Sequence, residues 1–455
     1  MKNKHAASFR DPDGFIFSHN GEIHRQITPR GLTDYKAFMA SGLYSTLVGK
    51  KYLIPHEELD QSLAGDGLTI KPEQLTFISQ PYEWCFAQLK DAALLTLYSQ
   101  MEALKAGFSL KDATAYNVQF HNGRPVFIDT LSFEPYDEGK PWVAYKQFCQ
   151  HFMAPLALAA HVDVRSIKLF QNFIDGVPLD LASAMLKGKK RFDLGLLTHI
   201  HWHAKTQLKY ADKQTNSTKS GNVSKMGMLG LIDNLTGAIK KLKWNPAGTE
   251  WGDYYSFTNY NDDSFQHKKE IVQSWLSEDG PALVWDLGAN DGTFSSLASA
   301  QGRKTVAWDI DPIAVEKNYR RSRKDKEANM LPLILDLTNP SPAIGWGHTE
   351  RQSLEQRGPA DTVMALAIIH HLAISNNVPL ERIAEYFAKL GKTLIIEFVP
   401  KGDSQVNILL ATREDIFDQY DESGFEKAFT NYFTILQKEP VRGTKRTMYH
   451  LKANG

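Results

Sequence analysis

The residues most suited to binding a ligand form the segment Asp286-Leu-Gly-Ala-Asn-Asp-Gly292. This segment follows an apolar run and precedes a predicted helix at Thr293. Gly288 lets the chain turn tightly, and Gly292 lets the start of the helix approach a ligand. Backbone N–H groups at such a turn point into the crevice beyond the carboxyl end of the strand. We therefore expect a ligand-binding loop here, with Asp286, Gly288, Asn290 and Gly292 as its binding residues.

Two further acidic residues end the next two predicted strands. Asp309 lies 21 residues after Gly288, which is about the distance at which a carboxylate meets the two hydroxyls of a ribose. Asp336 ends the third strand, where its carboxylate could accept a hydrogen bond from an adenine amino group. Three acids at three successive strand ends predict a nucleoside site. The alternative is that these acids are ordinary helix caps.

The loop reads D-x-G-x-x-x-G and lacks the G-x-G-x-x-G spacing of dinucleotide-binding loops. This difference favours S-adenosylmethionine over NAD, because a sulfonium and an amino acid tail suit an acid-rich loop. Asp286 would then face the ammonium group of the ligand. The order of motifs resembles that of the class I S-adenosylmethionine-dependent methyltransferases, and Ala367, after the fourth strand, is assigned to the same cofactor site.

The fourth predicted strand leads into His370 and His371. The resemblance implies that this segment faces the methyl group, so either His could act as a general base on a hydroxyl or hold the substrate. Alternatively, one His packs under the sheet and the other is only polar lining. Glu397 and Lys401, at the end of the fifth strand, are further catalytic candidates.

Residues 246–455 as a whole resemble a bacterial family of methyltransferases related to host-specific nodulation proteins. The family implies a methyl-transfer fold and a cofactor, and it leaves the acceptor open. The aromatic stretch Trp251–Tyr260 is expected to form either a lid over the cofactor or part of a core. The resemblance rests on the runs WGDYYSFTNYNDDSF, DLTNPSPAIGW, ALAIIHHLAISNNVPL and IIEFVPKGDSQVNILLATREDIF.

The first half of the chain contains a second acidic pattern, in which Asp112, Asn117 and Asp129 surround a predicted hairpin. In protein-kinase-like folds, similar positions hold the catalytic Asp, a metal-binding Asn and a metal-binding Asp. The sequence departs from that pattern, because Leu110-Lys111 replaces the usual His-Arg and Thr130-Leu131 replaces the usual Phe-Gly.

No glycine-rich phosphate loop precedes this pattern, and Arg25 is a poor substitute for the strand-borne Lys that binds phosphates in kinases. Three interpretations follow for this half. The acids are incidental to a helix and a hairpin, or the half is a non-catalytic kinase-like module, or it is an active phosphotransferase that uses ATP and Mg²⁺.

Alternating His199, His201 and His203 would share one face of a strand, as metal ligands do, but would spread apart on a helix. No acid or Cys is interleaved with them, so we expect no metal site. The two cysteines, Cys85 and Cys149, form no C-x-x-C pair, which excludes a disulfide framework and predicts free buried thiols in a cytoplasmic protein.

Apolar strands alternate with helices from Ala282 to Pro400, and this alternation predicts a doubly wound parallel α/β sheet of the Rossmann type. Residues 429–453 add an expected antiparallel pair. The first half predicts an α+β domain with a long helix over 85–106. Its two hairpins, over 15–27 and 118–128, each turn at Asn-Gly.

Residues 204–225 are polar and separate the two halves, which predicts a domain over 1–203, a linker over 204–225 and a methyltransferase domain over 226–455. Residues 201–250 hold eight Lys and three acidic residues. This basic surplus, together with the cluster over 187–191, leaves an anionic partner such as RNA open, although a solvated linker is favoured.

The chain has 455 residues, with 52 basic and 52 acidic side chains, 42% hydrophobic and 23% charged. This composition is that of a soluble globular protein and argues against one that is basic over its whole surface. No secretory signal and no membrane span are expected.

Three hypotheses follow. The first is a methyltransferase whose N-terminal domain binds the substrate or regulates the enzyme, with a sugar hydroxyl, a lipid hydroxyl or a small metabolite favoured as acceptor over RNA or protein. The second is an ATP-dependent phosphotransferase. The third is a scaffold with a vestigial pocket.

Overall fold

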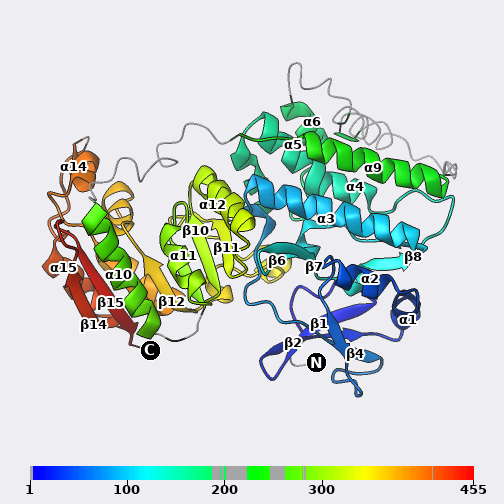
Figure 1. The fold of residues 1–455 in the computed structure, drawn as a ribbon, viewed down its shortest axis with the longest axis horizontal. Helices are drawn as coiled ribbons and strands as arrows, with labels where there is room; N and C mark the ends of the chain where they lie inside the picture. The colour runs from blue at the N-terminus through cyan, green and yellow to red at the C-terminus, as the bar shows by residue number, and fades with distance from the viewer. Residues whose placement is uncertain are drawn as a thin grey trace. The chain divides into compact units, whose positions relative to one another are not determined.

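The computed structural model describes residues 4–186, 195, 199–200, 223–245, 262–278, 280, 283–411 and 413–454. The chain divides into two compact units (Figure 1). Unit 1 consists of Met1–Asn245 and Ile344–Arg351, and unit 2 consists of Pro246–Ala343 and Gln352–Gly455.

Unit 1 begins with a four-stranded antiparallel sheet in the order β1-β2-β4-β3. Asn20 and Gly21, with φ of 52° and 80°, form the turn between β1 and β2, which is the conformation that Asn-Gly adopts readily. This predicted hairpin is therefore confirmed. The strands are β1 Gly14–His19, β2 Glu22–Ile27, β3 His56–Glu58 and β4 Leu68–Pro72.

A 20-residue helix, α3 (Phe86–Lys105), is the main core helix of the rest of unit 1, and the predicted helix over 85–106 is confirmed. The second predicted hairpin is β6 (Val118–His121) with β7 (Arg124–Phe127), again turning at Asn-Gly. The other elements are α1 Leu32–Ala40, α2 Leu43–Gly49, β5 Phe108–Leu110, β8 Phe133–Pro135, α4 Tyr145–Phe148, α5 Ala154–His161, α6 Leu179–Met185 and α9 Lys225–Lys241.

The position of α9 corrects the expected start of the second domain at residue 226. Helix α9 packs along α3, and the two helices run side by side in Figure 1. The Lys90 ammonium donates to the carbonyl oxygens of Lys240 and Leu242, at 2.9 and 2.7 Å. A basic side chain at the last carbonyls of a helix satisfies groups that have no partner within the helix. Residues 226–245 therefore belong to unit 1.

The segment Ile344–Arg351 also belongs to unit 1, although it lies within the range predicted for the second domain. The guanidinium of Arg10 donates to the Glu350 carboxylate at 2.5 and 3.1 Å. The Arg351 guanidinium lies 4.1 Å from the centre of the Tyr116 ring. Contacts between residues so distant in the chain are decided by tertiary structure.

Unit 2 contains a seven-stranded sheet in the order β11-β10-β9-β12-β13-β15-β14. The first five strands in this order are parallel, and β15 and β14 are antiparallel to their neighbours, which confirms the predicted Rossmann-like sheet with a terminal antiparallel pair. The strands are β9 Val284–Leu287, β10 Thr305–Asp309, β11 Met330–Ile334, β12 Ala360–Ala365, β13 Gly391–Phe398, β14 Phe433–Pro440 and β15 Thr447–Ala453.

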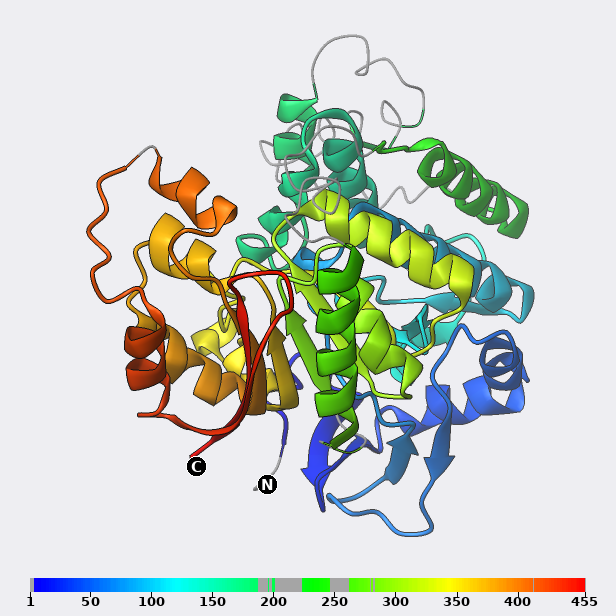
Figure 2. The same ribbon diagram turned by 60° about the vertical axis from the view of Figure 1, so that its left-hand side comes forward.

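Helices cover both faces of this sheet. On β15, the His450 ring stacks on Trp275 of α10, whereas the neighbouring Tyr449 ring lies 4.8 Å from Phe425 of α15. Because successive side chains of a strand point to opposite faces, α10 and α15 lie on opposite sides. Figure 2 shows the β14–β15 pair with α10 beside it. The helices are α10 Asp262–Glu278, α11 Thr293–Ala300, α12 Pro312–Asp325, α13 Leu380–Leu390, α14 Ser404–Leu410 and α15 Glu422–Phe429.

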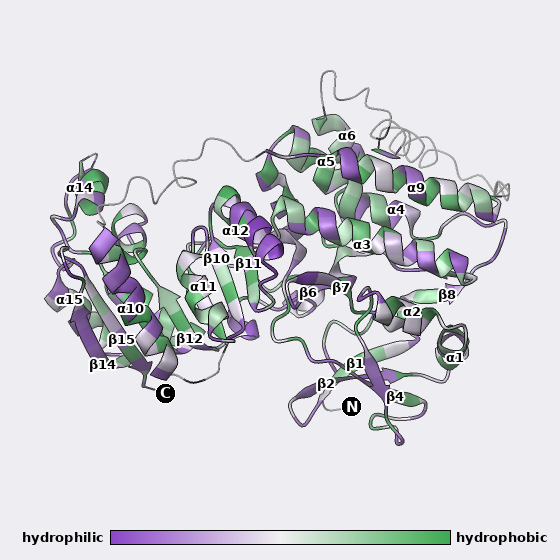
Figure 3. Cartoon of the chain, in the orientation of Figure 1, coloured by the Kyte–Doolittle hydropathy of each residue, from purple (hydrophilic) through white to green (hydrophobic). Residues whose placement is uncertain are grey.

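The core beneath α10 is apolar and continuous. Val272 and Trp275 pack with Val284, Met364 and Ile395, which come from three neighbouring strands. The outer surface of α12 is hydrophilic, as Figure 3 shows. Such helices on a sheet that is buried on both faces explain why the strands are apolar throughout.

Within the described residues, no helix is both long and apolar enough to cross a membrane. Cys85 and Cys149 are both buried free thiols, as predicted. Most of the predicted linker over 204–225, the basic cluster over 187–191 and the aromatic stretch Trp251–Tyr260 lie outside the described residues.

Candidate active site

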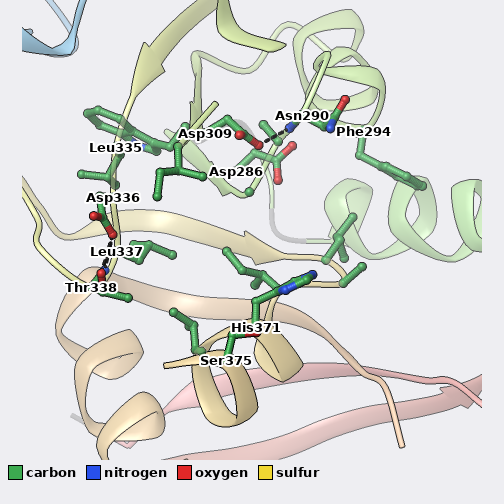
Figure 4. A pocket seen from close by; sticks show the side chains of 18 of the residues that line it. Asp286, Asn290, Phe294, Asp309, Leu335, Asp336, Leu337, Thr338, His371 and Ser375 are labelled. Carbon is green, nitrogen blue, oxygen red and sulfur yellow. Dashed lines mark hydrogen bonds between the residues drawn. The ribbon is translucent and has the colours of Figure 1, made fainter. Parts of the chain in front are cut away.

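A cavity of about 350 Å³ lies in unit 2, at the carboxyl ends of β9, β10, β11 and β12. At this point of the sheet the chain turns from building strands on one side of β9 to building them on the other, and open α/β sheets bind ligands at such a point. Figure 4 shows its acidic side chains coming from separate elements. The lining residues include Phe265, Lys268, Asp286, Gly288, Asn290, Phe294, Asp309, Asp336, Ala367, His371, Ser375 and Asn376.

The loop after β9 adopts the tight turn that its glycines predict. Gly288, with φ of 79°, lines the cavity, and a Cβ there would approach the Ile368 side chain to 2.9 Å. Asn290, with φ of 51°, also lines it. Gly292, with φ of 82°, does not line the cavity, because its Cα faces the side chain of Asn318. The structure thus assigns Gly292 to helix packing and not to close approach of a ligand.

Asp286, at the end of β9, is buried and lines the cavity. Its carboxylate accepts a hydrogen bond from the Ser295 hydroxyl at 2.6 Å. Burial raises the pKa of Asp286 to about 7, although the nearby Lys268 ammonium opposes this shift. A carboxyl group held in this way gains from a cationic ligand, which would replace the lost solvation of its charged form.

Asp309, at the end of β10, is similarly buried, and burial raises its pKa to about 6. Its carboxylate accepts hydrogen bonds from the backbone N–H groups of Asn290 and Asp311, at 2.7 and 2.8 Å. Figure 4 shows the bond to Asn290, which ties the loop to the next strand. The carboxylate also lines the cavity, so it can meet hydroxyl donors of a ligand.

Asp336 follows β11 and is partly exposed at the cavity. Its carboxylate accepts from the N–H and hydroxyl of Thr338, at 2.9 and 2.6 Å, as Figure 4 shows. The three predicted acids, Asp286, Asp309 and Asp336, therefore share one cavity. Asp309 and Asp336 also accept hydrogen bonds from backbone N–H groups. The same side chains therefore stabilise the local backbone and line the cavity.

The segment after β12 reaches the cavity through Ala367 and His371. Ala367 has a φ of 53°, which is uncommon for a residue with a Cβ and marks a strained turn beside the cavity. His371 lines the cavity, and burial lowers its pKa to about 4, so its ring is neutral at pH 7.

His370 does not line the cavity. It is fully buried, its ring lies 4.1 Å from that of His371, and burial lowers its pKa well below the usual value. The structure thus separates the two histidines, and His371 is the one that can contact a ligand. His370 corresponds to the alternative in which one His packs under the sheet.

Glu397 is likewise absent from the cavity lining, although it was a catalytic candidate. Its side chain is fully buried, and its carboxylate accepts from the Lys268 ammonium at 2.6 Å and lies 3.5 Å from the Arg446 guanidinium. A carboxylate enclosed in this way cannot contact a substrate in this structure. Lys401, the other candidate at this edge, pairs with Asp415 at 2.8 Å.

Sequence reasoning missed Lys268 and its aromatic neighbours Phe265 and Phe294, which line the same cavity. The sequence of α10 contains the pattern that could have predicted Lys268. Lys268 lies three residues before Ile271 and seven before Trp275, so it shares the apolar face of the helix. A Lys on that face is unusual enough to predict a buried partner or a ligand.

In unit 1, the structure brings Asp112, Asn117 and Asp129 together. The Asn117 amide donates to the Ser132 hydroxyl at 3.2 Å. Burial and the charge of Asp129 raise the pKa of Asp112, whereas the nearby Asn117 side chain opposes this shift. Asp129 accepts from the Leu131 N–H at 3.0 Å and from the Ser132 hydroxyl at 2.8 Å. The three side chains of the kinase-like pattern therefore lie near one another.

Arg25 of β2 forms an ion pair with the Asp129 carboxylate and a second one with Asp11 at 2.9 Å. With the Leu131 and Ser132 bonds, both Asp129 oxygens already have protein donors. Over the part of the chain that the structure describes, no group of three or more His, Cys, Asp or Glu is arranged to hold a metal ion. Arg25 thus pairs with the carboxylate that the kinase-like interpretation assigns to a metal ion.

The His199 ring contacts the Tyr145 hydroxyl and the Asn234 side-chain oxygen, each at 2.7 Å. Its two nitrogens thus join α4 to α9 within unit 1. His201 and His203 lie outside the described residues, so the alternation itself stays untested.

No protein-family model matches this chain. Nodulation protein NoeA of Rhizobium meliloti (strain 1021) is 36% identical over 458 residues, an alignment that covers 98% of this chain and 95% of that protein. This match confirms the resemblance to nodulation-related proteins and extends it from residues 246–455 to nearly the whole chain.

Solved structures show weaker similarity. Magnesium protoporphyrin IX methyltransferase from Synechocystis PCC 6803 with bound SAH is 21% identical, over 45% of this chain and 93% of that one, with a TM-score of 0.32. N-methyltransferase NodS from Bradyrhizobium japonicum WM9 is 10% identical, over 43% and 99%, with a TM-score of 0.31. The bifunctional kinase-methyltransferase WbdD is 14% identical, over 43% and 40%, with a TM-score of 0.30. TM-scores of this size do not establish a shared function. By its identity to one relative along nearly its entire length, the chain belongs to the family of nodulation protein NoeA.

Proposed function

We propose that this protein is an S-adenosylmethionine-dependent methyltransferase whose cofactor occupies the cavity of unit 2. The observation that carries the proposal is the placement of Asp286, Asp309 and Asp336 at the ends of three adjacent parallel strands, all lining one cavity. Its volume of about 350 Å³ is within the usual range for a ligand of nucleoside size.

The side chains that line this cavity fit the parts of S-adenosylmethionine. Asp309 would accept from the two ribose hydroxyls, and Asp336 from the adenine amino group. Asp286 would accept from the ammonium of the methionine tail. Gly288 and Asn290 would bring backbone close to the ligand, and Ala367 would border it.

When bound, S-adenosylmethionine supplies a methyl group on a positively charged sulfur that leaves readily. The chain itself then needs to position an acceptor in line with that methyl group and to exclude water. His371 is the lining residue best placed to accept or orient a proton of the acceptor, because its ring is neutral at pH 7. With a pKa near 4, His371 is a weak base. It therefore suits an acceptor that loses its proton easily, or it orients the acceptor without removing a proton.

Several chemical classes of methyl acceptor are compatible with this proposal. A sugar or lipid hydroxyl or a small metabolite is favoured over nucleic acid, since the chain has equal numbers of basic and acidic side chains. We assign unit 1 to substrate binding or regulation.

The test is calorimetric titration of the full-length protein with S-adenosylmethionine. We expect binding that weakens at least tenfold in Asp309→Asn, because the neutral amide loses charge-assisted hydrogen bonds to the ribose. Asp415→Asn is the matched control, since Asp415 pairs with Lys401 at the surface of the same unit. Absence of binding by the unsubstituted protein would reject the proposal and favour a scaffold.

An ATP-dependent phosphotransferase is the alternative, favoured only by the convergence of Asp112, Asn117 and Asp129. The Arg25–Asp129 ion pair speaks against it. A rise in melting temperature with ATP and Mg²⁺ that disappears in Asp129→Asn would support this alternative. No rise with the unsubstituted protein would reject it.

A further inference from the structure

Lys268 of α10 is a buried cation at the wall of the candidate cofactor cavity. The residue is 2% exposed, yet it lines the cavity together with Asp286 and Phe294. Its ammonium lies 4.6 Å from the centre of the Phe294 ring. Burying an ammonium is costly unless it is compensated by hydrogen bonds and opposite charge. The burial of Lys268 at this wall therefore indicates a structural or binding role for its ammonium.

A chain of buried charges holds Lys268 in place. Its ammonium donates to Glu397 at 2.6 Å, and Glu397 lies 3.5 Å from Arg446. The Arg446 guanidinium in turn donates to both oxygens of Asp403, at 2.8 and 3.2 Å. The Glu397 carboxylate is therefore nearer to the Lys268 ammonium than to the Arg446 guanidinium. These contacts hold the Lys268 ammonium at the cavity wall and keep it from turning toward solvent.

The Asp286 carboxylate also attracts the Lys268 ammonium electrostatically, and both side chains line the cavity. The cavity wall thus places an ammonium group and a carboxyl group close together. An α-amino acid group presents the complementary pair, an ammonium and a carboxylate on one carbon. A Lys ammonium carries three N–H donors, so it can bind the carboxylate of a ligand and Glu397 together.

We propose that Lys268 binds the carboxylate of the methionine tail of S-adenosylmethionine, while Asp286 binds its ammonium, and that Glu397 and Arg446 are positioning residues for Lys268. The inference rests on the proposed function and extends it, since it names the group that selects ligands with an intact amino acid tail. It also gives Glu397 a role that does not require contact with the substrate.

The test compares S-adenosylmethionine with its decarboxylated form, which keeps the sulfonium and the ammonium and lacks only the carboxylate. We expect the unsubstituted protein to bind S-adenosylmethionine about 10- to 100-fold more tightly, the range for a hydrogen bond between charged groups. In Lys268→Met the two affinities should become equal, because S-adenosylmethionine loses its partner while the decarboxylated ligand is bound as before.

Loss of Lys268 removes a cation that pairs with the buried Glu397, so the substitution could also disturb folding. Lys268→Met/Glu397→Gln removes that excess charge, and its affinity for the decarboxylated ligand reports whether the cavity is intact. For the positioning role, Glu397→Gln keeps an acceptor for Lys268 and should retain most of the preference, whereas Glu397→Leu should lose it.

The outcomes separate this inference from the function on which it rests. An unsubstituted protein that prefers S-adenosylmethionine, with the same preference in Lys268→Met, overturns the inference and leaves the methyltransferase proposal standing. Equal affinities already in the unsubstituted protein also overturn it. If the unsubstituted protein binds neither ligand, both proposals fail together.

Discussion

Asp286 illustrates how a single side chain carries both a cost to folding and a capacity for binding. Its carboxyl is buried with one hydroxyl donor, and burial raises its pKa to about 7. Ionising it without a ligand is unfavourable, so its stabilising effect on the fold is complete below its unfolded pKa near 4 and is lost as the pH rises through 7. A cationic ligand reverses this preference, because it stabilises the charged form.

The affinity for S-adenosylmethionine should therefore increase as the pH rises from about 5.5 to 8. Below pH 7 Asp286 is largely protonated and cannot pair with the ligand ammonium, and we expect roughly a tenfold loss per pH unit while that holds. Titrations at several pH values measure the effect. Asp286→Asn should bind weakly throughout and lose the part of the rise near pH 7. A rise unchanged in Asp286→Asn would contradict the assignment of Asp286.

At the scale of elements, the turn from β9 into α11 depends on how closely α12 approaches it. A Cβ at Gly292 would lie 2.3 to 2.6 Å from the Asn318 side chain. Asn318 is buried and accepts hydrogen bonds from Arg321 and Ser322, so it cannot simply move away. The glycine is needed both for its positive φ and for the room that α12 leaves.

Gly292→Ala should lower the free energy of unfolding more than Gly302→Ala, by roughly 1 to 3 kcal/mol. Both glycines have φ near 80°, but a Cβ at Gly302 meets nothing within 4 Å. The backbone cost is thus shared, and the difference isolates the contact with Asn318. Urea unfolding of the two variants measures it. Equal destabilisation would mean that Asn318 yields to the new side chain.

The predicted elements agree with the structure because their signals are local. Asn-Gly determines both hairpin turns of unit 1, since its two residues adopt positive φ readily. Apolar runs such as 330–334 predict buried parallel strands without any knowledge of their neighbours. Helix α9 was assigned to the wrong domain, because its amphipathic pattern shows that it packs and does not show on what.

At the scale of the whole molecule, each unit has its own core. Unit 1 is organised around α3 and its neighbours, and unit 2 around the seven-stranded sheet. Units with separate cores commonly unfold as separate cooperative transitions. A ligand that binds one native unit stabilises only the transition in which its site is lost.

Calorimetric melting of the full-length chain should therefore show two transitions. S-adenosylhomocysteine at 100 times its dissociation constant should stabilise one of them by about 2.7 kcal/mol and leave the other in place. Asp309→Asn should abolish the shift, and Asp415→Asn should preserve it. A single transition that moves as a whole would show that the two units unfold together.

The sequence by itself determined the sheet of unit 2, its loop after β9 and the three acids at its strand ends, because strand period, glycine and spacing act along a short stretch of chain. It could not decide between His370 and His371, which differ by one position and have the same chemistry. It could not show that Glu397 is enclosed by Lys268 and Arg446, which are 129 and 49 residues away. Those outcomes belong to the tertiary structure alone, since burial and pairing depend on which distant elements meet.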